Sequence, residues 1–228
     1  MATGLALMML GGGMIALAKM ASNSVPGSSS SYTPPYRSVA PAPAGADAVV
    51  FFWYGCPHCL KLEEQFRQFD FSGTASSLVT ESGRGVFVRK VPVVLSSSWE
   101  LDARLYYALQ ALNFSDDGHF RVMKRYGKHR PTSLESVRAL LMSGVLDKER
   151  EENPSFRSTA DQVIELLYSP GIDAKISESL ALTQAIRLDG VPSVLVGRDK
   201  LLELGNGLGY HELMMATLDL LRGRTGAN

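Results

Sequence analysis

The chain has 228 residues, of which 45% are hydrophobic, so it is long enough for one sizeable core or for a core domain with a large insertion. Its 23 basic residues balance its 23 acidic residues, which argues against a nucleic-acid-binding protein, because such a protein needs a basic face. The two cysteines, Cys56 and Cys59, are too few for a disulfide framework, and no histidine pair joins them to complete a structural zinc site.

The first predicted element is an uncharged apolar run over residues 2–18. Its length is at the lower limit for a membrane-spanning helix, and Ala16-Leu17-Ala18 offers a signal-peptidase cleavage site. No Lys or Arg precedes the run, which is unusual for a signal and for an anchor. We expect residues 1–20 to be either a signal peptide or an N-terminal membrane anchor, with a buried N-terminal helix as the alternative.

Residues 21–46 form the next segment, which is rich in Pro and Ser and holds five of the eleven prolines. A segment of this composition buries little apolar surface, so we expect a linker that acts as a spacer. The folded part of the chain is predicted to start near Asp47.

Residues 47–95 are predicted to form the first half of a folded domain. The run Ala48–Tyr54 is continuously apolar and β-prone, as in a strand that is buried on both faces. A helix is expected to follow directly. Its apolar side chains recur at spacings of three and four residues: Cys59, Leu62, Phe66 and Phe69. With a second strand over residues 86–94, this half is a βαβ unit with a parallel strand pair.

Residues 96–186 are predicted to form a helical insertion. Two capping boxes, Ser97-x-x-Glu100 and Thr132-x-x-Glu135, indicate helix starts, and Gly144 indicates a helix end. A further helix is expected from Ser177 to about Leu188.

Residues 187–228 are predicted to complete the domain. Strands over residues 193–197 and 200–204 form a hairpin, and an amphipathic helix over residues 210–221 closes the chain. The sequence therefore predicts an α/β protein in which a helical insertion separates a βαβ half from a ββα half.

The Cys56-Pro57-His58-Cys59 motif lies between the first strand and its helix, and this position favours redox chemistry. A sulfur at a helix start is close to unpaired backbone N–H groups and to the positive end of the helix dipole. Pro57 fits the first turn, and His58 adds a neighbour that is cationic when protonated. We expect a strongly lowered pKa for the Cys56 thiol, while Cys59, one turn deeper, is the slower resolving thiol. A stabilised thiolate makes the disulfide oxidising.

At this motif the sequence resembles the DsbA family of periplasmic thiol:disulfide oxidoreductases. The similarity is carried by Phe51–Cys59 (FFWYGCPHC), continues to Glu64, and returns at Gly190–Ser193 (GVPS) after a helical insertion. It covers roughly residues 47–222. The resemblance implies a thioredoxin fold with a helical domain inserted between the βαβ and ββα halves.

The resemblance also implies roles for residues outside the motif. Pro192 would follow a cis peptide bond and pack against the disulfide, and the Val191 backbone would pair with an extended substrate. Glu63 would be a partly buried carboxylate that takes up the Cys59 proton through water, or else a surface charge. Many members of the family carry a buried Glu where this chain has Val50, so Glu63 is expected to be the one obvious buried acid.

Four further residues are assigned by type and position. Trp53 is expected either at the edge of the substrate groove or in the core. The histidines outside the motif, His119, His129 and His211, are interpreted as surface or capping residues.

We expect a thiol:disulfide oxidase that donates the Cys56–Cys59 disulfide to reduced, unfolded exported proteins through a mixed disulfide at Cys56. No metal and no cofactor beyond this disulfide is expected, and a DsbB-like, quinone-coupled membrane partner would restore it. The protein would be a monomer in the periplasm, either soluble or held at the inner membrane by residues 2–18. The alternatives are an envelope reductase or isomerase, and a thioredoxin-like chaperone or assembly factor that uses the peptide groove.

Overall fold

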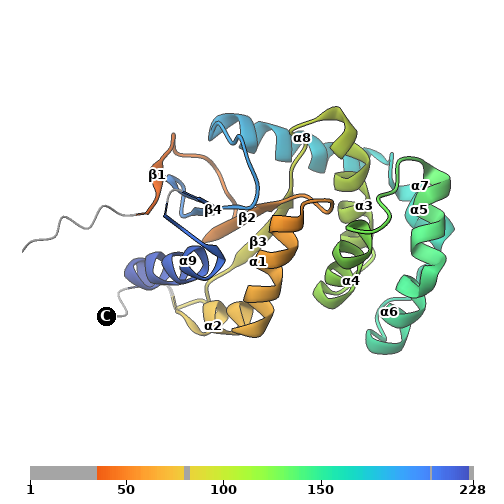
Figure 1. The fold of residues 1–228 in the computed structure, drawn as a ribbon, viewed down its shortest axis with the longest axis horizontal. Coiled ribbons are helices and arrows are strands. Elements are labelled where there is room, and N and C mark those ends of the chain that lie inside the picture. Colours follow the sequence, from red (N-terminus) through yellow and green to blue (C-terminus); the bar gives the residue numbers. More distant parts are fainter. Residues whose placement is uncertain (1–34, 80–82, 206, 226–228) are drawn as a thin grey trace, which may run out of the picture. The chain divides into compact units, whose positions relative to one another are not determined.

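The computed structural model describes residues 35–79, 83–205 and 207–225, and the predicted signal or anchor lies outside these ranges. The described chain is built around a five-stranded sheet with the order β1-β5-β4-β2-β3 (Figure 1). Its strands are β1 (Arg37–Ser38), β2 (Ala48–Phe52), β3 (Val88–Pro92), β4 (Ser193–Val196) and β5 (Lys200–Glu203). The pair β2 and β3 is parallel, whereas β4 is antiparallel to both β2 and β5. The predicted βαβ unit and the later hairpin are confirmed.

Helices account for most of the remaining described chain. They are α1 (Pro57–Gln68), α2 (Phe71–Ser77), η1 (Ser97–Trp99), α3 (Glu100–Ala111), α4 (Asp116–Tyr126), α5 (Leu134–Leu140), η2 (Leu141–Val145), α6 (Leu146–Glu152), α7 (Ala160–Leu166), α8 (Pro170–Ala185) and α9 (Tyr210–Thr225). Within the described ranges, none of them combines the length and the apolar character needed to cross a membrane.

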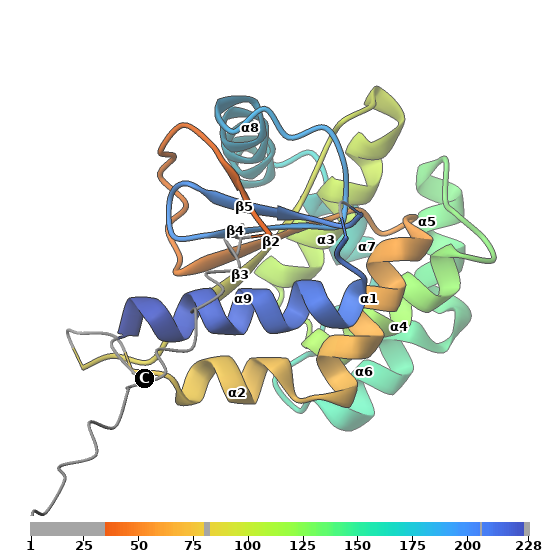
Figure 2. The same cartoon turned by 60° about the vertical axis from the view of Figure 1, so that its left-hand side comes forward.

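Both faces of the sheet are covered by helices, with α1, α2 and α9 on one face and α8 on the other (Figure 2). Because side chains alternate along a strand, β2 contributes Val50 to the first face and Val49 and Phe51 to the second. Every residue of β2 is buried. The continuous apolar run of β2 is therefore explained by a strand that is covered on both sides.

The helices from α3 to α7 form a separate apolar cluster beside the sheet (Figure 1). Helix α3 lies at its centre and is buried from Asp102 to Leu109. The predicted helix end at Gly144 is confirmed as a break, because Ser143 and Gly144 leave helical geometry and Gly144 has a φ of 88°, and the next helical segment follows at once across this kink. This left-handed backbone conformation is one that glycine adopts without steric cost.

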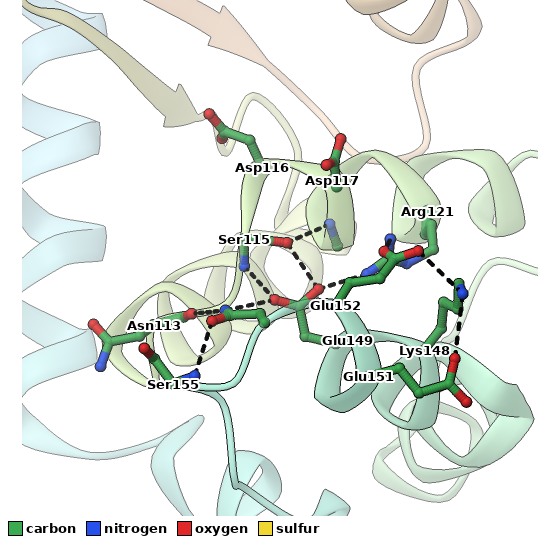
Figure 3. Close-up of polar contacts among 12 residues, drawn as sticks. Asn113, Ser115, Asp116, Asp117, Arg121, Lys148, Glu149, Glu151, Glu152 and Ser155 are labelled. Carbon is green, nitrogen blue, oxygen red and sulfur yellow. Dashed lines mark hydrogen bonds and ion pairs between the residues drawn. The ribbon is translucent and has the colours of Figure 1, made fainter.

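Buried Glu149 ties the helices of this cluster together (Figure 3). Its carboxylate accepts hydrogen bonds from the Ser115 backbone N–H at 2.7 Å, the Ser115 hydroxyl at 2.8 Å and the Asn153 amide at 2.8 Å. It also forms an ion pair with Arg121 at 2.5 Å. Since a buried carboxylate is costly without partners, this set holds α6 against the N-terminus of α4.

Three predicted helix starts differ from the structure. Helix α5 is capped by Ser133 with Ser136, one residue later than the predicted box at Thr132. Ser97 is the first residue of a 3₁₀ turn whose N-cap is Ser96, and α3 begins after it at Glu100 with Trp99 as its N-cap. Helix α8 begins at Pro170 instead of Ser177, and its C-terminal half covers the sheet.

The expected linker is also shorter than predicted, because residues 37–44 dock on the sheet edge. Strand β1 pairs with β5, and Arg37 donates two hydrogen bonds to Glu203, at 3.0 and 3.1 Å. Ala42 and Ala44 are buried beside α8 and the sheet. Small alanines between prolines fit a shallow apolar surface, so composition alone underestimated the burial available here.

Candidate active site

The two cysteines lie at the N-terminus of α1, where β2 delivers the chain. Cys56 is the N-cap residue, and its Sγ accepts a hydrogen bond from the Cys59 backbone N–H at 3.2 Å. Pro57 occupies the first turn, where no N–H donor is needed. Both thiols are free and nearly buried, with 6% of Cys56 and 3% of Cys59 exposed.

The two thiols differ in acidity. The pKa of Cys56 is lowered from 9.0 to about 7, first by a hydrogen bond from the Cys59 side chain and then by the backbone N–H groups of Cys59 and His58, while burial opposes the shift. The pKa of Cys59 is raised well above its ordinary value, mainly by burial and then by the side-chain hydrogen bond to Cys56. The predicted division into an acidic outer thiol and a neutral inner thiol agrees with this geometry.

The imidazole of His58 is not the source of the lowered pKa of Cys56. His58 is exposed, and its Nδ1 forms a hydrogen bond of 2.7 Å with the hydroxyl of Tyr210, the first residue of α9. The two rings lie 6.3 Å apart in a stacked arrangement. No sequence pattern indicated Tyr210 as a neighbour of the motif, because only the folded chain brings α9 to the start of α1.

The Val191–Pro192 peptide bond faces Cys56 from the neighbouring strand. It is cis, as the family resemblance implied, and Pro192 is buried at the start of β4. The Sγ of Cys56 lies 3.6 Å from the Val191 carbonyl oxygen. A backbone segment is therefore placed directly beside the reactive sulfur.

Trp53 connects this site to the helical cluster. Its indole stacks on Trp99 with 4.2 Å between ring centroids, and its Nε1 donates a hydrogen bond of 2.5 Å to Asp102. The indole also covers Gly55, because a Cβ atom built on Gly55 would lie 2.3 Å from the ring. Trp53 is half-buried, so it packs against the core cluster and also lies next to the cysteine motif.

A small cavity of about 20 Å³ lies below the cysteines and has room for one water molecule. Cys59, Glu63 and Lys90 are among its lining residues. Glu63 is 8% exposed and forms ion pairs with Lys90 at 3.0 Å and with Arg67 at 3.3 Å. Glu63 is therefore a buried carboxylate near Cys59, and its charge is compensated by two cations.

Glu63 is not the only buried acid among the described residues, contrary to the sequence-based expectation. Asp102 is 1% exposed and Glu149 is fully buried. Asp102 accepts hydrogen bonds from Trp53 and from Arg130. Both carboxylates lie on helices of the insertion, where tertiary partners that sequence spacing does not reveal make their burial tolerable.

His119 is buried, so its assignment as a surface or capping histidine is wrong. Its Nδ1 forms a hydrogen bond with the hydroxyl of Tyr54, and it lines the cavity below Cys59. Burial lowers the pKa of His119 from 6.5 to about 3, so the imidazole is neutral. A stripe on α4 could have revealed this position, since residues three, four and seven positions after His119 are all buried. The other two histidines, His129 and His211, are exposed as expected.

No group of three or more His, Cys, Asp or Glu residues in the described part of the chain is arranged to hold a metal ion.

Comparisons with known proteins agree with this geometry, although no family model matches the chain. Over 159 residues the chain is 26% identical to the thiol:disulfide interchange protein DsbA of Burkholderia cepacia, a match that covers 68% of this chain and 65% of that protein, just under two thirds of its length. The crystal structure of Pseudomonas aeruginosa DsbA superposes with a TM-score of 0.67 at 19% identity, over 87% of this chain and 98% of that chain. A DsbA from Proteus mirabilis, solved with a non-covalently bound peptide, superposes with a TM-score of 0.61 at 15% identity, over 83% and 95% of the two chains. The fold is the thioredoxin fold with an inserted helical domain.

Proposed function

Since the chain is similar to DsbA thiol:disulfide interchange proteins in sequence and in fold, we propose that it is an oxidase of this family that passes the Cys56–Cys59 disulfide to reduced, unfolded polypeptides. The observation that carries the proposal is the difference between the two thiols. Cys56 has a lowered pKa and is a good leaving group, whereas the raised pKa of Cys59 keeps it protonated once it is released.

In the proposed reaction, a substrate thiolate attacks the Sγ of Cys56 and breaks the bond to Cys59. Cys59 leaves with the electron pair and takes up a proton, and a mixed disulfide now joins Cys56 to the substrate. A second substrate thiolate then attacks the substrate sulfur of the mixed disulfide and releases Cys56 as a thiolate. The substrate loses two electrons to the protein's disulfide, so the protein ends as the dithiol and no further cofactor takes part.

The surrounding residues have proposed roles in this reaction. The Cys59 proton would pass by way of Glu63 and one water in the cavity, because both residues line it. The backbone of partly buried Val191 would pair with an extended substrate next to Cys56, with Pro192 setting the position of that segment. Trp53 would form the edge of this substrate-binding region on the side of the helical insertion.

We also propose the cell envelope as the place of action. A quinone-coupled membrane protein of the DsbB type would accept electrons from the dithiol and restore the disulfide. If residues 2–18 serve as a tether, they would raise the effective concentration of the domain near such a partner.

A reductase is the second candidate, because the Cys56 pKa of about 7 is also the value typical of thioredoxin. The reduction potential of the pair in a glutathione buffer distinguishes the two. A potential near that of DsbA, about −120 mV, supports the oxidase, and one near that of thioredoxin, about −270 mV, overturns it.

A matched pair of variants tests the mechanism. Mixed with a reduced, unfolded disulfide protein and an oxidant, Cys59→Ser should accumulate a mixed disulfide at Cys56, whereas Cys56→Ser should accumulate none. Full cellular activity in the Cys56→Ser, Cys59→Ser double variant would instead favour a chaperone or assembly factor.

A further inference from the structure

A basic groove lies on the helical insertion, outside the cysteine site. It has a volume of about 650 Å³ and is formed by the end of α4, the α4–α5 loop, α5 and η2. Its basic lining residues are Lys124, Arg125, Lys128, His129 and Arg130. No Asp or Glu lines the groove, although the chain as a whole is neutral.

Most of this positive charge is uncompensated. Lys124, Arg125 and Lys128 are exposed, and no ion pair involves them in the part of the chain that the structure describes. The neighbouring Arg130 differs, because it forms an ion pair with Asp102 at 2.9 Å. Three cations around one concave surface produce a positive potential that favours an anionic ligand.

A second surface groove differs from the basic groove in its charge. That groove has a volume of about 530 Å³ and contains both cations and carboxylates, among them Arg67, Lys90, Asp70 and Asp117. Its opposite charges compensate one another. The basic groove is therefore not a general property of the depressions on this protein.

Arg130, which lines the basic groove, contacts Trp53 beside the cysteine motif. The guanidinium of Arg130 lies 4.8 Å from the centroid of the Trp53 ring, and the same ring covers Gly55, which precedes Cys56. Through this contact, the basic groove and the cysteine motif are linked by two neighbouring side chains.

We propose that the basic groove binds an acidic stretch of the substrate polypeptide close to its reacting cysteine, and that it makes the protein prefer acidic substrates. This inference rests on the proposed oxidase function and names a substrate class for it. A polypeptide fits better than an anionic lipid surface, because the groove is concave and its Arg130 contacts Trp53 beside the cysteine motif. Buried Pro131 and Leu140 supply apolar contacts for the side chains between the acidic residues.

The test compares two short peptides, each with one pair of cysteines, that differ only in flanking glutamates or glutamines. The oxidised protein should react faster with the glutamate peptide, by about two- to fivefold for each engaged charge, and high salt should remove the difference. The Arg125→Gln, Lys128→Gln double variant should bring the ratio of the two rates close to one. The control Arg198→Gln removes an exposed charge at the β4–β5 turn and should keep the wild-type ratio.

The outcomes separate this inference from the proposed function. Equal rates for both peptides in the wild-type protein, or a ratio that persists in the double variant, overturn the basic groove as a substrate site while leaving the oxidase intact. If neither peptide is oxidised, the proposed function fails, and anisotropy with a cysteine-free, fluorescein-labelled glutamate peptide still tests the groove. Binding of that peptide that is weakened in the double variant supports the inference, and absence of binding overturns it. Groove-dependent binding to phosphatidylglycerol vesicles without any peptide preference would assign the groove to a membrane surface instead.

Discussion

Replacing Cys59 by Ala tests what makes Cys56 acidic. The largest contribution to its lowered pKa is the hydrogen bond from the Cys59 side chain, and backbone N–H groups add to it. A hydrogen bond to an ionised group contributes about 1.5–3 kcal/mol, and one pKa unit equals about 1.4 kcal/mol. Because the backbone donors remain, we expect Cys59→Ala to raise the pKa of Cys56 by about one unit, from about 7 to about 8.

The measurement is the ultraviolet absorbance of the thiolate as a function of pH. Cys59→Ser is the matched control, because its hydroxyl can still donate to the Cys56 sulfur, so its titration should stay close to the wild-type value. If Cys59→Ala also titrates at about 7, the side-chain hydrogen bond is not the cause, and the helix N-terminus alone sets the acidity of Cys56.

Three further predictions concern residues around the site. His119 has a pKa of about 3 in the folded protein and about 6.5 when unfolded, so between these pH values the unfolded state binds more protons and each pH unit of acidification lowers the free energy of unfolding by about 1.4 kcal/mol. The free energy of unfolding measured in urea should therefore depend less on pH in His119→Asn than in the wild-type protein. An equal dependence in both proteins would contradict a buried neutral imidazole. Gly55→Ala should push the Trp53 indole away and destabilise the protein by about 1–3 kcal/mol, with an altered near-ultraviolet circular dichroism spectrum, whereas an unchanged spectrum would show that the ring does not cover Gly55. Tyr210→Phe should lower the free energy of unfolding by about 0.5–1.5 kcal/mol in the wild-type protein and leave it unchanged in a His58→Ala background. Equal decreases in both backgrounds would rule out the hydrogen bond between His58 and Tyr210.

The parts of the fold that sequence predicted well are those where one local signal decides the structure. The apolar run of β2 indicated a strand covered on both faces, and the cysteine motif after it indicated a helix N-terminus. The capping prediction at Thr132 was wrong by one residue because the adjacent Ser133 also has a polar partner three positions later. Where two neighbouring residues are chemically equivalent caps, only the packing of the helix selects between them.

The parts of the site that sequence missed depend on contacts between distant elements. Tyr210 reaches His58 only because α9 packs beside α1 on the sheet. Burial of Asp102 depends on Arg130 and Trp53, which lie on two other elements. His119 was mispredicted for a different reason: an isolated histidine is usually exposed, but this one lies on the buried apolar stripe of α4.

The docked segment at β1 also changes what one edge of the sheet offers to other extended polypeptides. An open sheet edge would offer backbone N–H and C=O groups to any extended polypeptide, and such pairing would hold a substrate far from the sulfur. Strand β1 covers the edge of β5 with a piece only two residues long, one of them the charged Arg37. So short and charged a strand is a poor template for further pairing, and this edge of the sheet is thereby protected against edge-to-edge association.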